Sequence, residues 1–349
     1  MKFSEIGEFG FIDSIKGQCD IPAKGLIKGI GDDCAVLRSQ SGRVLLFTAD
    51  MLVQDIHFVI GKIPFYQLGR KAAAVNLSDI AAMGGRPLVL LTSLAVPVET
   101  EVEEIQELYR GMRDICEHHG LTIGGGDTVA SPDKLVTNIS VIGDARENEV
   151  LYRSGTSPGD RVYLTGYVGD SIAGLKILTD EITPPEEMGT YFIKAHNEPV
   201  ALVETGRSIA ASGLASAMID LSDGLLSDLG HICEESRVGA LLFAEKIPLS
   251  SELKRLANGV GFNPLDLALS GGEDYQLLFT VPAEHEQGIE ELFKEHDLAA
   301  LYHIGEIVER PGIRMVKADG SIEELQHKGF NHFNRNQRQD YEQGVLDSH

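Results

Sequence analysis

The chain has 349 residues, of which 53 are acidic and 30 are lysine or arginine, so its formal net charge at pH 7 is −23. A surface this acidic disfavours binding to nucleic acid and to anionic lipid, because both require clusters of basic side chains. The composition, with 43% hydrophobic and 24% charged residues, is typical of a globular protein, and the length favours two domains. No segment approaches the roughly 18 apolar residues of a membrane span, and the N-terminus has no secretory signal, so we expect a cytoplasmic protein without membrane contact.

Apolar runs in the first half of the chain predict strands and helices. Three short runs have the length and composition of strands: residues 44–50, 88–94 and 135–141. Apolar side chains at three- and four-residue steps predict helices over residues 66–83 and 102–115. The second helix is predicted to begin at a capping box formed by Thr100 and Glu103 and to end at Gly120.

A polar, turn-rich stretch over residues 144–160 is the best candidate for a domain boundary. After it, apolar runs predict strands at residues 161–165, 217–220 and 276–281 and helices near residues 171–178, 200–212 and 225–235. The fold class expected from this order is α/β, in the broad sense of a mixed α+β protein. We assign residues 1–148 to an N-terminal domain of sheet and helices, residues 149–333 to a C-terminal α/β domain, and residues 334–349 to a polar tail.

Acidic residues recur beside glycine at the ends of the apolar runs. These acidic corners are Gly31-Asp32-Asp33, Asp50, Asp79, Gly126-Asp127, Asp220-Leu221-Ser222-Asp223 and Gly272-Glu273-Asp274. One aspartate beside glycine is most often a turn residue or a helix cap, and the run Gly124-Gly125-Gly126 alone is typical of a loop. Several corners together favour a metal site, because Mg²⁺ is held by carboxylates together with water and substrate phosphates.

Two of the corners have a structural interpretation beside the functional one. Asn76 and Asp79 share one face of a helix so apolar that it must be buried, and the carboxylate then needs either a metal ion or a basic neighbour. At the other corner, Ser222 is predicted to cap a helix whose dipole Asp223 complements. Alternatively, this helix N-terminus binds phosphate while Asp220 and Asp223 bind metal.

The common phosphate-binding motifs are absent from the sequence. There is no Walker A sequence, no third glycine after Gly29-Ile30-Gly31 to complete a dinucleotide fingerprint, and no signature of protein kinases or α/β-hydrolases. Of the 11 histidines, His57, which follows the corner at Asp50, is the candidate for a functional role. Phosphate chemistry in this chain would therefore depend on the acidic corners.

Taken in order, these segments resemble the thiamine-monophosphate kinase family, within the aminoimidazole-ribotide synthetase-like superfamily. The resemblance extends over nearly the whole chain, and as a set the segments are highly specific. They are Gly7-Glu8-Phe9, Gly29–Ala35, Asp50–Val53 with His57-Phe58, Asn76–Gly84, Gly124–Thr128, Arg153-Ser154-Gly155, Gly169-Asp170-Ser171, Asp220–Leu225, Ser270–Tyr275 and Gly329–Phe333.

The resemblance implies ATP-dependent phosphorylation of thiamine monophosphate to thiamine diphosphate with several Mg²⁺ ions. It also implies an N-terminal domain that binds ATP and magnesium and pairs through its sheet in a homodimer, with the C-terminal domain packed over it to complete the active site. The implied magnesium ligands are Asp33, Thr48, Asp50, Asp79, Asp127, Asp220 and Asp223. The implied ATP-binding residues are Tyr109, Gly126, Asp127, Arg153 and Ser222, the thiamine-binding residues are His57, Glu273 and Phe330, and the catalytic residues are Arg153, Asp127 and Asp223.

The chain departs from the family pattern at two positions. The family often has Ser-Thr-Asp where this chain has Thr48-Ala49-Asp50, and often has tryptophan where this chain has Phe330. The chemistry agrees with the acidic corners, because the acceptor is a phosphate oxygen whose second pKa is about 6, so it is ionised without a strong general base. We therefore expect direct phosphoryl transfer, with no phosphorylated enzyme on the pathway.

Three other interpretations stay open at this point. A related ATP-dependent synthetase, of the aminoimidazole-ribotide or selenophosphate type, would use similar corners. A two-metal phosphohydrolase would also gather aspartates, although such sites usually add histidines, which are nearly absent from these corners. A non-enzymatic scaffold for Ca²⁺ or Mg²⁺ would bind metal without nucleotide, and the EF-hand pattern that it would most simply use is absent.

Overall fold

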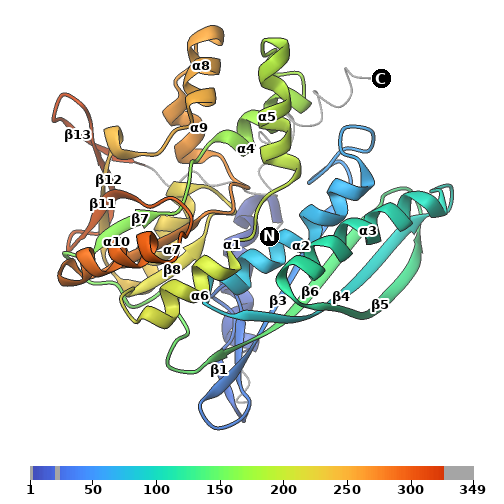
Figure 1. Cartoon of the computed structure of the whole chain (residues 1–349), viewed down its shortest axis with the longest axis horizontal. Coiled ribbons are helices and arrows are strands. Elements are labelled where there is room, and N and C mark those ends of the chain that lie inside the picture. The colour runs from blue at the N-terminus through green and yellow to red at the C-terminus, as the bar shows by residue number, and fades with distance from the viewer. Residues whose placement is uncertain (1–2, 20–23, 326–349) are drawn as a thin grey trace.

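A computed structural model describes residues 3–19 and 24–325 of the chain. Within this part of the chain, two β-sheets, one from each half of the sequence, are flanked by helices (Figure 1). This arrangement confirms the mixed α/β fold class. No helix among the described residues is long and apolar enough to cross a membrane. Phe330 and the predicted tail at residues 334–349 lie outside the described residues.

The N-terminal half builds a six-stranded sheet in the order β1-β2-β3-β6-β4-β5. Its elements are α1 (Phe3–Cys19), β1 (Leu26–Lys28), β2 (Ala35–Arg38), β3 (Arg43–Val53), α2 (Phe65–Ala82), β4 (Arg86–Pro97), α3 (Val102–His119), β5 (Thr122–Ser131) and β6 (Val136–Arg146). Side chains alternate along β3, so Val44, Leu46 and Leu52 are buried while Met51 is exposed. Helices α2 and α3 cover the buried face (Figure 1).

Helices α2 and α3 lie side by side in backbone contact. A Cβ atom added to Gly69 would lie 1.9 Å from the carbonyl oxygen of Leu108, and one added to Gly111 would lie 1.9 Å from that of Tyr66. Glycine on both helices therefore allows a separation that no larger side chain would permit. This close packing fixes α2, which carries the predicted site residue Asp79.

The C-terminal half builds a seven-stranded sheet in the order β13-β12-β9-β11-β7-β10-β8. Its elements are β7 (Arg161–Leu164), α4 (Asp170–Leu178), α5 (Glu186–Asn197), α6 (Val203–Ser212), β8 (Ala217–Asp220), α7 (Leu225–Ser236), β9 (Gly239–Phe243), the 3₁₀ turn η1 (Ala244–Lys246), α8 (Ser251–Val260), α9 (Pro264–Ser270), β10 (Leu277–Val281), the 3₁₀ turn η2 (Ala283–His285), α10 (Glu286–Glu295), β11 (Tyr302–Val308), β12 (Gly312–Val316) and β13 (Ile322–Leu325). Strand β8 forms one edge of this sheet and ends at Asp220.

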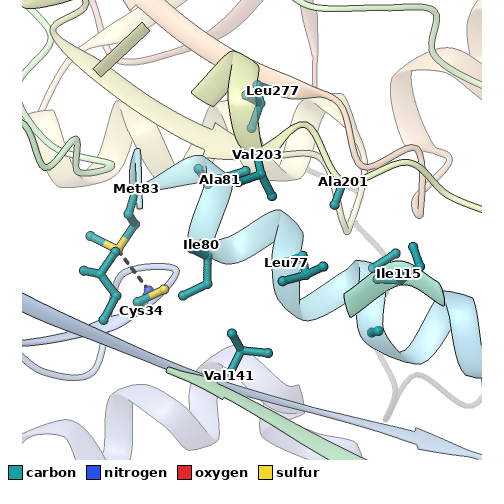
Figure 2. Packing of buried hydrophobic residues seen from close by; sticks show 14 of the residues in the cluster. Cys34, Leu77, Ile80, Ala81, Met83, Ile115, Val141, Ala201, Val203 and Leu277 are labelled. Atoms are coloured by element: carbon teal, nitrogen blue, oxygen red, sulfur yellow. Dashed lines mark hydrogen bonds between the residues drawn. The ribbon is translucent and has the colours of Figure 1, made fainter. Parts of the chain in front are cut away.

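One hydrophobic core joins the two halves of the chain around α2. Figure 2 shows Leu77 and Ile80 of this helix between Val141 of the N-terminal sheet and residues of the C-terminal half such as Val203. In the same core, the backbone N–H of Cys34 donates to the sulfur of Met83 at 3.1 Å. Polar residues on α2 are therefore placed at the junction of the two halves.

The strands and helices expected from the sequence are present, with ends shifted by a few residues. The capping box was predicted one residue early: Glu101 and Glu104 form it, while the predicted end at Gly120 is confirmed by its left-handed backbone. The run Gly124-Gly125-Gly126 is not a loop but part of β5. A Cβ atom on Gly126 would lie 1.7 Å from the carbonyl oxygen of Thr92, so glycine here permits the close approach of β4.

Candidate active site

Three aspartates from distant parts of the sequence meet beside α2. Asp33 precedes β2, Asp79 lies near the end of α2, and Asp220 ends β8. Oxygen atoms from all three lie within 4.8 Å of one another, and we call these residues the carboxylate cluster. Oδ2 of Asp33 and Oδ2 of Asp220 are buried without a hydrogen-bond partner among the described residues. Unpaired, buried carboxylate oxygens this close together require a cation or a bound proton.

The pKa values of the carboxylate cluster reflect this mutual repulsion. Burial, followed by the negative charge of Asp33, raises the pKa of Asp220 to about 8. Burial also raises the pKa of Asp79 well above its ordinary value, with Asp50 and Asp220 adding to the shift. For Asp33, burial raises the pKa despite the nearby Arg153. A cation bound among these groups would favour their ionised forms and reverse the shifts.

Strand β3 contributes two more of the predicted ligands on the face that packs against α2. The hydroxyl of Thr48 donates a hydrogen bond to Oδ2 of Asp79. The backbone N–H of Asp50 donates to the side-chain oxygen of Asn76 at 3.1 Å, and burial raises the pKa of the Asp50 carboxyl to about 6. Asp79 has no ion pair with lysine or arginine among the described residues, so the basic neighbour considered from the sequence is not present there.

Arg153 supplies positive charge to one side of the carboxylate cluster. Its Nη2 and Nε atoms lie 2.5 Å and 3.2 Å from Oδ1 of Asp33. Lys28 lies 3.2 Å from Oδ2 of Asp32, the neighbouring aspartate, whose pKa is raised to about 6 by burial and by Asp33. Asp32 was part of an acidic corner in the sequence but was not predicted as a site residue. These contacts leave the second oxygen of Asp33 free to bind another group.

Two loops of the C-terminal half bring Ser222, Asp223 and Glu273 together. The backbone N–H of Glu273 donates to the carbonyl oxygen of Ser222 at 2.8 Å. Helix α7 begins after Gly224, so the predicted cap at Ser222 is wrong. Instead, Oδ2 of Asp228 accepts from the N–H groups of Asp223 and Gly224 at 3.2 and 3.1 Å. These two amides are therefore not available to a phosphate, and burial raises the pKa of Asp223 to about 7.

A second group of ionisable side chains, which we call the Lys71 cluster, consists of the buried Lys71 and His196 and the partly exposed Glu273. Nζ of Lys71 lies 3.0 Å from Oε2 of Glu273 and 3.2 Å from Nε2 of His196. Burial opposes ionisation of Glu273, but Lys71, His196 and His57 together bring its pKa below the ordinary value. His57, whose Nδ1 accepts from the N–H of Val53 at 3.0 Å, is thus close enough to Glu273 for its charge to lower that pKa.

Asp127, Gly126 and Tyr109 are not brought to the carboxylate cluster within one chain. Asp127 is exposed on edge strand β5 and lies opposite Ser93, a register that gives it the same sheet face as Met51 of β3. Asp50, next to Met51, faces the other side of the sheet. Three strand spacings, about 14 Å, also separate β5 from β3. Tyr109 is half-buried on α3.

Four residues in and beside these clusters were not predicted from the sequence to be functional: Lys71, His196, Asp228 and Asp32. One signal was present for Lys71, because a lysine inside the apolar run of α2 requires a buried acidic partner. No local pattern marks His196 or Asp228, since their partners come from other elements or from a loop geometry that the sequence does not reveal.

Comparisons with known proteins fit this architecture. Residues 31–145 match the family model of AIR synthase related protein, N-terminal domain, and residues 157–317 match that of the C-terminal domain, so the chain belongs to the AIR synthase related proteins. The chain is 36% identical over 333 residues to thiamine-monophosphate kinase of Bacillus subtilis, covering 93% of this chain and 99% of the relative. The corresponding protein of Aquifex aeolicus is 35% identical, with 95% and 100% covered. Within the AIR synthase related proteins, the chain therefore belongs to the thiamine-monophosphate kinase family.

Solved structures give the same result. A structure described as AaThiL complexed with AMPPCP and TMP has a TM-score of 0.83 and 34% identity, and the match covers 95% of this chain and 99% of that one. Thiamine-monophosphate kinase of Stenotrophomonas maltophilia has a TM-score of 0.72 and 31% identity, with 89% and 95% covered. The family expected from the order of the acidic corners is thus confirmed.

Proposed function

We propose that this chain is an ATP-dependent kinase that phosphorylates thiamine monophosphate to thiamine diphosphate. The observation that carries the proposal is the carboxylate cluster, with its unpaired buried oxygens and Arg153 at its side, in a member of the thiamine-monophosphate kinase family. The related AaThiL structure is described as a complex with AMPPCP and TMP, an ATP analogue and the acceptor proposed here. Two anionic substrates would be repelled by such an acidic site unless cations accompany them.

The donor groups of the site fit Mg²⁺, a hard cation that prefers oxygen ligands. The residues proposed to hold it are Asp33, Thr48, Asp50, Asp79, Asp220 and Asp223, with Asp127 as a further ligand. The unpaired Oδ2 atoms of Asp33 and Asp220 support this assignment, because each is buried and lacks any other partner among the described residues. When bound, Mg²⁺ would neutralise the phosphates and stabilise the charge that develops during transfer.

The other side chains divide between the two substrates. For ATP we propose Arg153, Ser222, Gly126 and Tyr109, with Arg153 supplying fixed positive charge near the transferred phosphate. For the thiamine moiety we propose His57 and Glu273, which lie near each other, and Phe330. The nucleophile is a phosphate oxygen already ionised near pH 7, so no residue must act as a strong base. Catalysis is then alignment of donor and acceptor plus charge stabilisation, with direct in-line transfer.

A homodimer is part of this proposal. Met51, Leu91 and Val129 are 53%, 39% and 53% exposed, and the strand register places all three on the sheet face opposite α2. Strand β5 is exposed along most of its ten residues, and such an edge normally requires a covering partner. A second copy pairing through this sheet would cover both and could bring its own Asp127 to the carboxylate cluster. We likewise propose domain limits at residues 1–148 and 149–333, so that each domain contains one of the two sheets.

The deciding experiment is a product assay with purified protein, ATP, Mg²⁺ and thiamine monophosphate, with thiamine diphosphate resolved by chromatography. We expect thiamine diphosphate and ADP in equal amounts, only when Mg²⁺ is present. Free thiamine and aminoimidazole precursors serve as alternative acceptors in parallel reactions. ADP release with a precursor but not with thiamine monophosphate would transfer the assignment to a related synthetase. Phosphate release without any acceptor would instead indicate a phosphohydrolase.

The absence of a phosphorylated enzyme is tested separately. Protein incubated with γ-labelled ATP and Mg²⁺, then denatured and separated from nucleotide, should carry no label. A stoichiometric, chemically labile acyl phosphate formed at the rate of turnover would contradict direct transfer.

A further inference from the structure

Lys71 is a fully buried lysine on a helix whose neighbouring buried positions are mostly apolar. It has 0% exposure, and the residues around it on α2 include Ala72 and Leu68. Burying an ammonium group is costly unless it is paired, and leucine or methionine could fill the same space. Both of its side-chain partners, Glu273 and His196, come from the C-terminal half. The lysine therefore links α2 to the loop that carries a proposed thiamine-binding residue.

His196 completes the link in a defined tautomer. Its Nε2 atom is 3.2 Å from Nζ of Lys71, which has only protons to donate, so Nε2 accepts and Nδ1 carries the ring proton. Nδ1 lies 3.2 Å from Oε2 of Glu273 and 3.2 Å from Oγ of Ser171. Burial and then Lys71 lower the pKa of His196 to about 4, which keeps the ring neutral at pH 7. The hydrogen bond of Nδ1 is with the Ser171 hydroxyl, so His196 lies against Oε2 of Glu273 and holds Nζ of Lys71, which is the hydrogen-bond donor to that oxygen.

The backbone that carries Glu273 is strained. Glu273 and Tyr275 have φ values of 64° and 48°, a region that costs free energy for any residue other than glycine. The residue between them, Asp274, accepts from the N–H groups of Gly169 at 2.8 Å and Ser171 at 3.3 Å. Strained segments persist only where surrounding contacts fix them, and here the contacts anchor the loop on both sides of the Glu273 side chain.

We propose that Lys71 and His196 are positioning residues that hold Glu273 in the orientation needed to bind the thiamine moiety of the acceptor. Both contacts are made to Oε2, and the side chain keeps 24% exposure, so Oε1 is the oxygen offered to the acceptor. Because Lys71 already balances the charge of Glu273, the carboxylate acts as an oriented hydrogen-bond acceptor in an overall neutral pair. This inference rests on the proposed function, since it concerns how the same site binds the phosphate acceptor.

The proposal predicts that loss of Lys71 affects the binding of one substrate and not the other, whereas a purely structural role for Lys71 would affect both. Loss of the lysine would free the Glu273 side chain and weaken acceptor binding, while the ATP-binding groups, which Lys71 does not contact, would be unchanged. A lysine that only ties α2 to α5 would instead lower stability and change both substrates alike. The effect should also pass through Glu273, so a variant that lacks Glu273 should not depend on Lys71.

The test measures kcat and KM for thiamine monophosphate and for ATP, at saturating Mg²⁺, in the full-length protein. The variants are Lys71→Met, Glu273→Gln and the double variant. The control is Lys317→Met, which removes a lysine that follows β12, far from the site, and that pairs with Glu323 at 2.8 Å. We expect Lys71→Met to raise KM for thiamine monophosphate about tenfold, the factor typical of a lost hydrogen bond to a charged group, with KM for ATP changed less than about twofold. The double variant should be no worse than Glu273→Gln.

His196→Asn keeps the proposal testable if Lys71→Met does not fold. It should raise KM for thiamine monophosphate about threefold, again without changing KM for ATP, because the acceptor that holds Nζ of Lys71 toward Glu273 is removed. Equal changes in both KM values, unchanged KM for the acceptor, or additive effects in the double variant would overturn the proposal. If the unmodified protein forms no thiamine diphosphate, the proposed function fails instead, and the two failures are thereby distinguished.

Discussion

The carboxylate cluster and the Lys71 cluster both lie beside α2, yet they balance their charges in opposite ways. Asp79 and Lys71 lie about two turns apart on that helix. Around Asp79, like charges converge and two oxygens have no partner among the described residues. Around Lys71, every charged group contacts an opposite charge or a hydrogen-bond partner within the chain. The first cluster is the one for which we propose cations from solution, whereas the charges of the second are balanced within the protein.

The largest effect expected from this contrast is that of Asp79→Asn. The variant loses one carboxylate of the cluster while keeping its shape, so metal-dependent turnover should fall by about a thousandfold or more. Without metal, the same variant should be at least as stable as the unmodified protein, because a repulsive charge has been removed. Product assays and thermal unfolding in EDTA measure the two quantities. A folded variant with normal turnover would remove Asp79 from the metal site.

Arg153→Met tests the part of the carboxylate cluster that does have an internal counter-charge. Loss of its two contacts to Asp33 should lower kcat about a hundredfold, since fixed positive charge is removed from the phosphates. Arg161→Met is the matched control, because Arg161 pairs with Glu306 at 3.0 Å away from the site. Should both variants retain full kcat, Arg153 has only a structural role.

The two clusters should respond to pH in opposite directions when no metal is present. Asp220 has a pKa of about 8 in the folded protein against an ordinary 3.8, so the folded state holds a proton that the unfolded chain releases. Its contribution to stability is present at acidic pH and lost as the pH rises through about 8. His196, with a pKa of about 4 against 6.5, contributes above pH 6.5 and loses that contribution as the pH falls to about 4.

Thermal unfolding of the protein in EDTA across this pH range measures both limbs. Asp220→Asn should reduce only the loss of stability at alkaline pH, and His196→Asn should reduce only the loss of stability at acidic pH. Adding Mg²⁺ at pH 8 should raise the melting temperature of the unmodified protein by several degrees, because a ligand that binds only the folded state stabilises it. An alkaline limb that survives in Asp220→Asn would mean that another group controls stability there.

The same contrast explains how far the sequence could predict the site. The acidic corners were visible because aspartates recur in or at the ends of apolar runs and most of them lie beside glycine, a local pattern. The sequence therefore predicted Asp33, Asp79 and Asp220 as site residues, but it could not predict how far apart they lie in the fold. The Lys71 cluster is built from three elements with no shared local pattern, so its partners emerge only when α5 and the loop after α9 fold against α2.

The prediction of the fold was limited in a similar way. Long apolar runs gave the central strands and helices, because their periodicity depends on neighbouring residues alone. Strand β5 was missed because its glycines, typical of a loop, are needed for the close approach of β4, and no neighbouring residue records that partner. The cap at Ser222 was wrong for a related reason, since Asp228, one turn into α7, binds the free amides instead.

The smallest effect is expected for Thr48→Val, which removes the hydroxyl that contacts Asp79 of the carboxylate cluster. Its hydroxyl donates to Asp79, so valine, of nearly equal volume, removes one hydrogen bond and one proposed oxygen ligand without disturbing the packing of β3. We expect about a tenfold rise in the Mg²⁺ concentration needed for half-maximal rate, with kcat at saturating Mg²⁺ lowered only a few-fold. Titration of the rate with Mg²⁺ measures both. A lower kcat with an unchanged Mg²⁺ requirement would show that Thr48 orients Asp79 but does not bind the metal, which would place the boundary of the metal site at the carboxylates themselves.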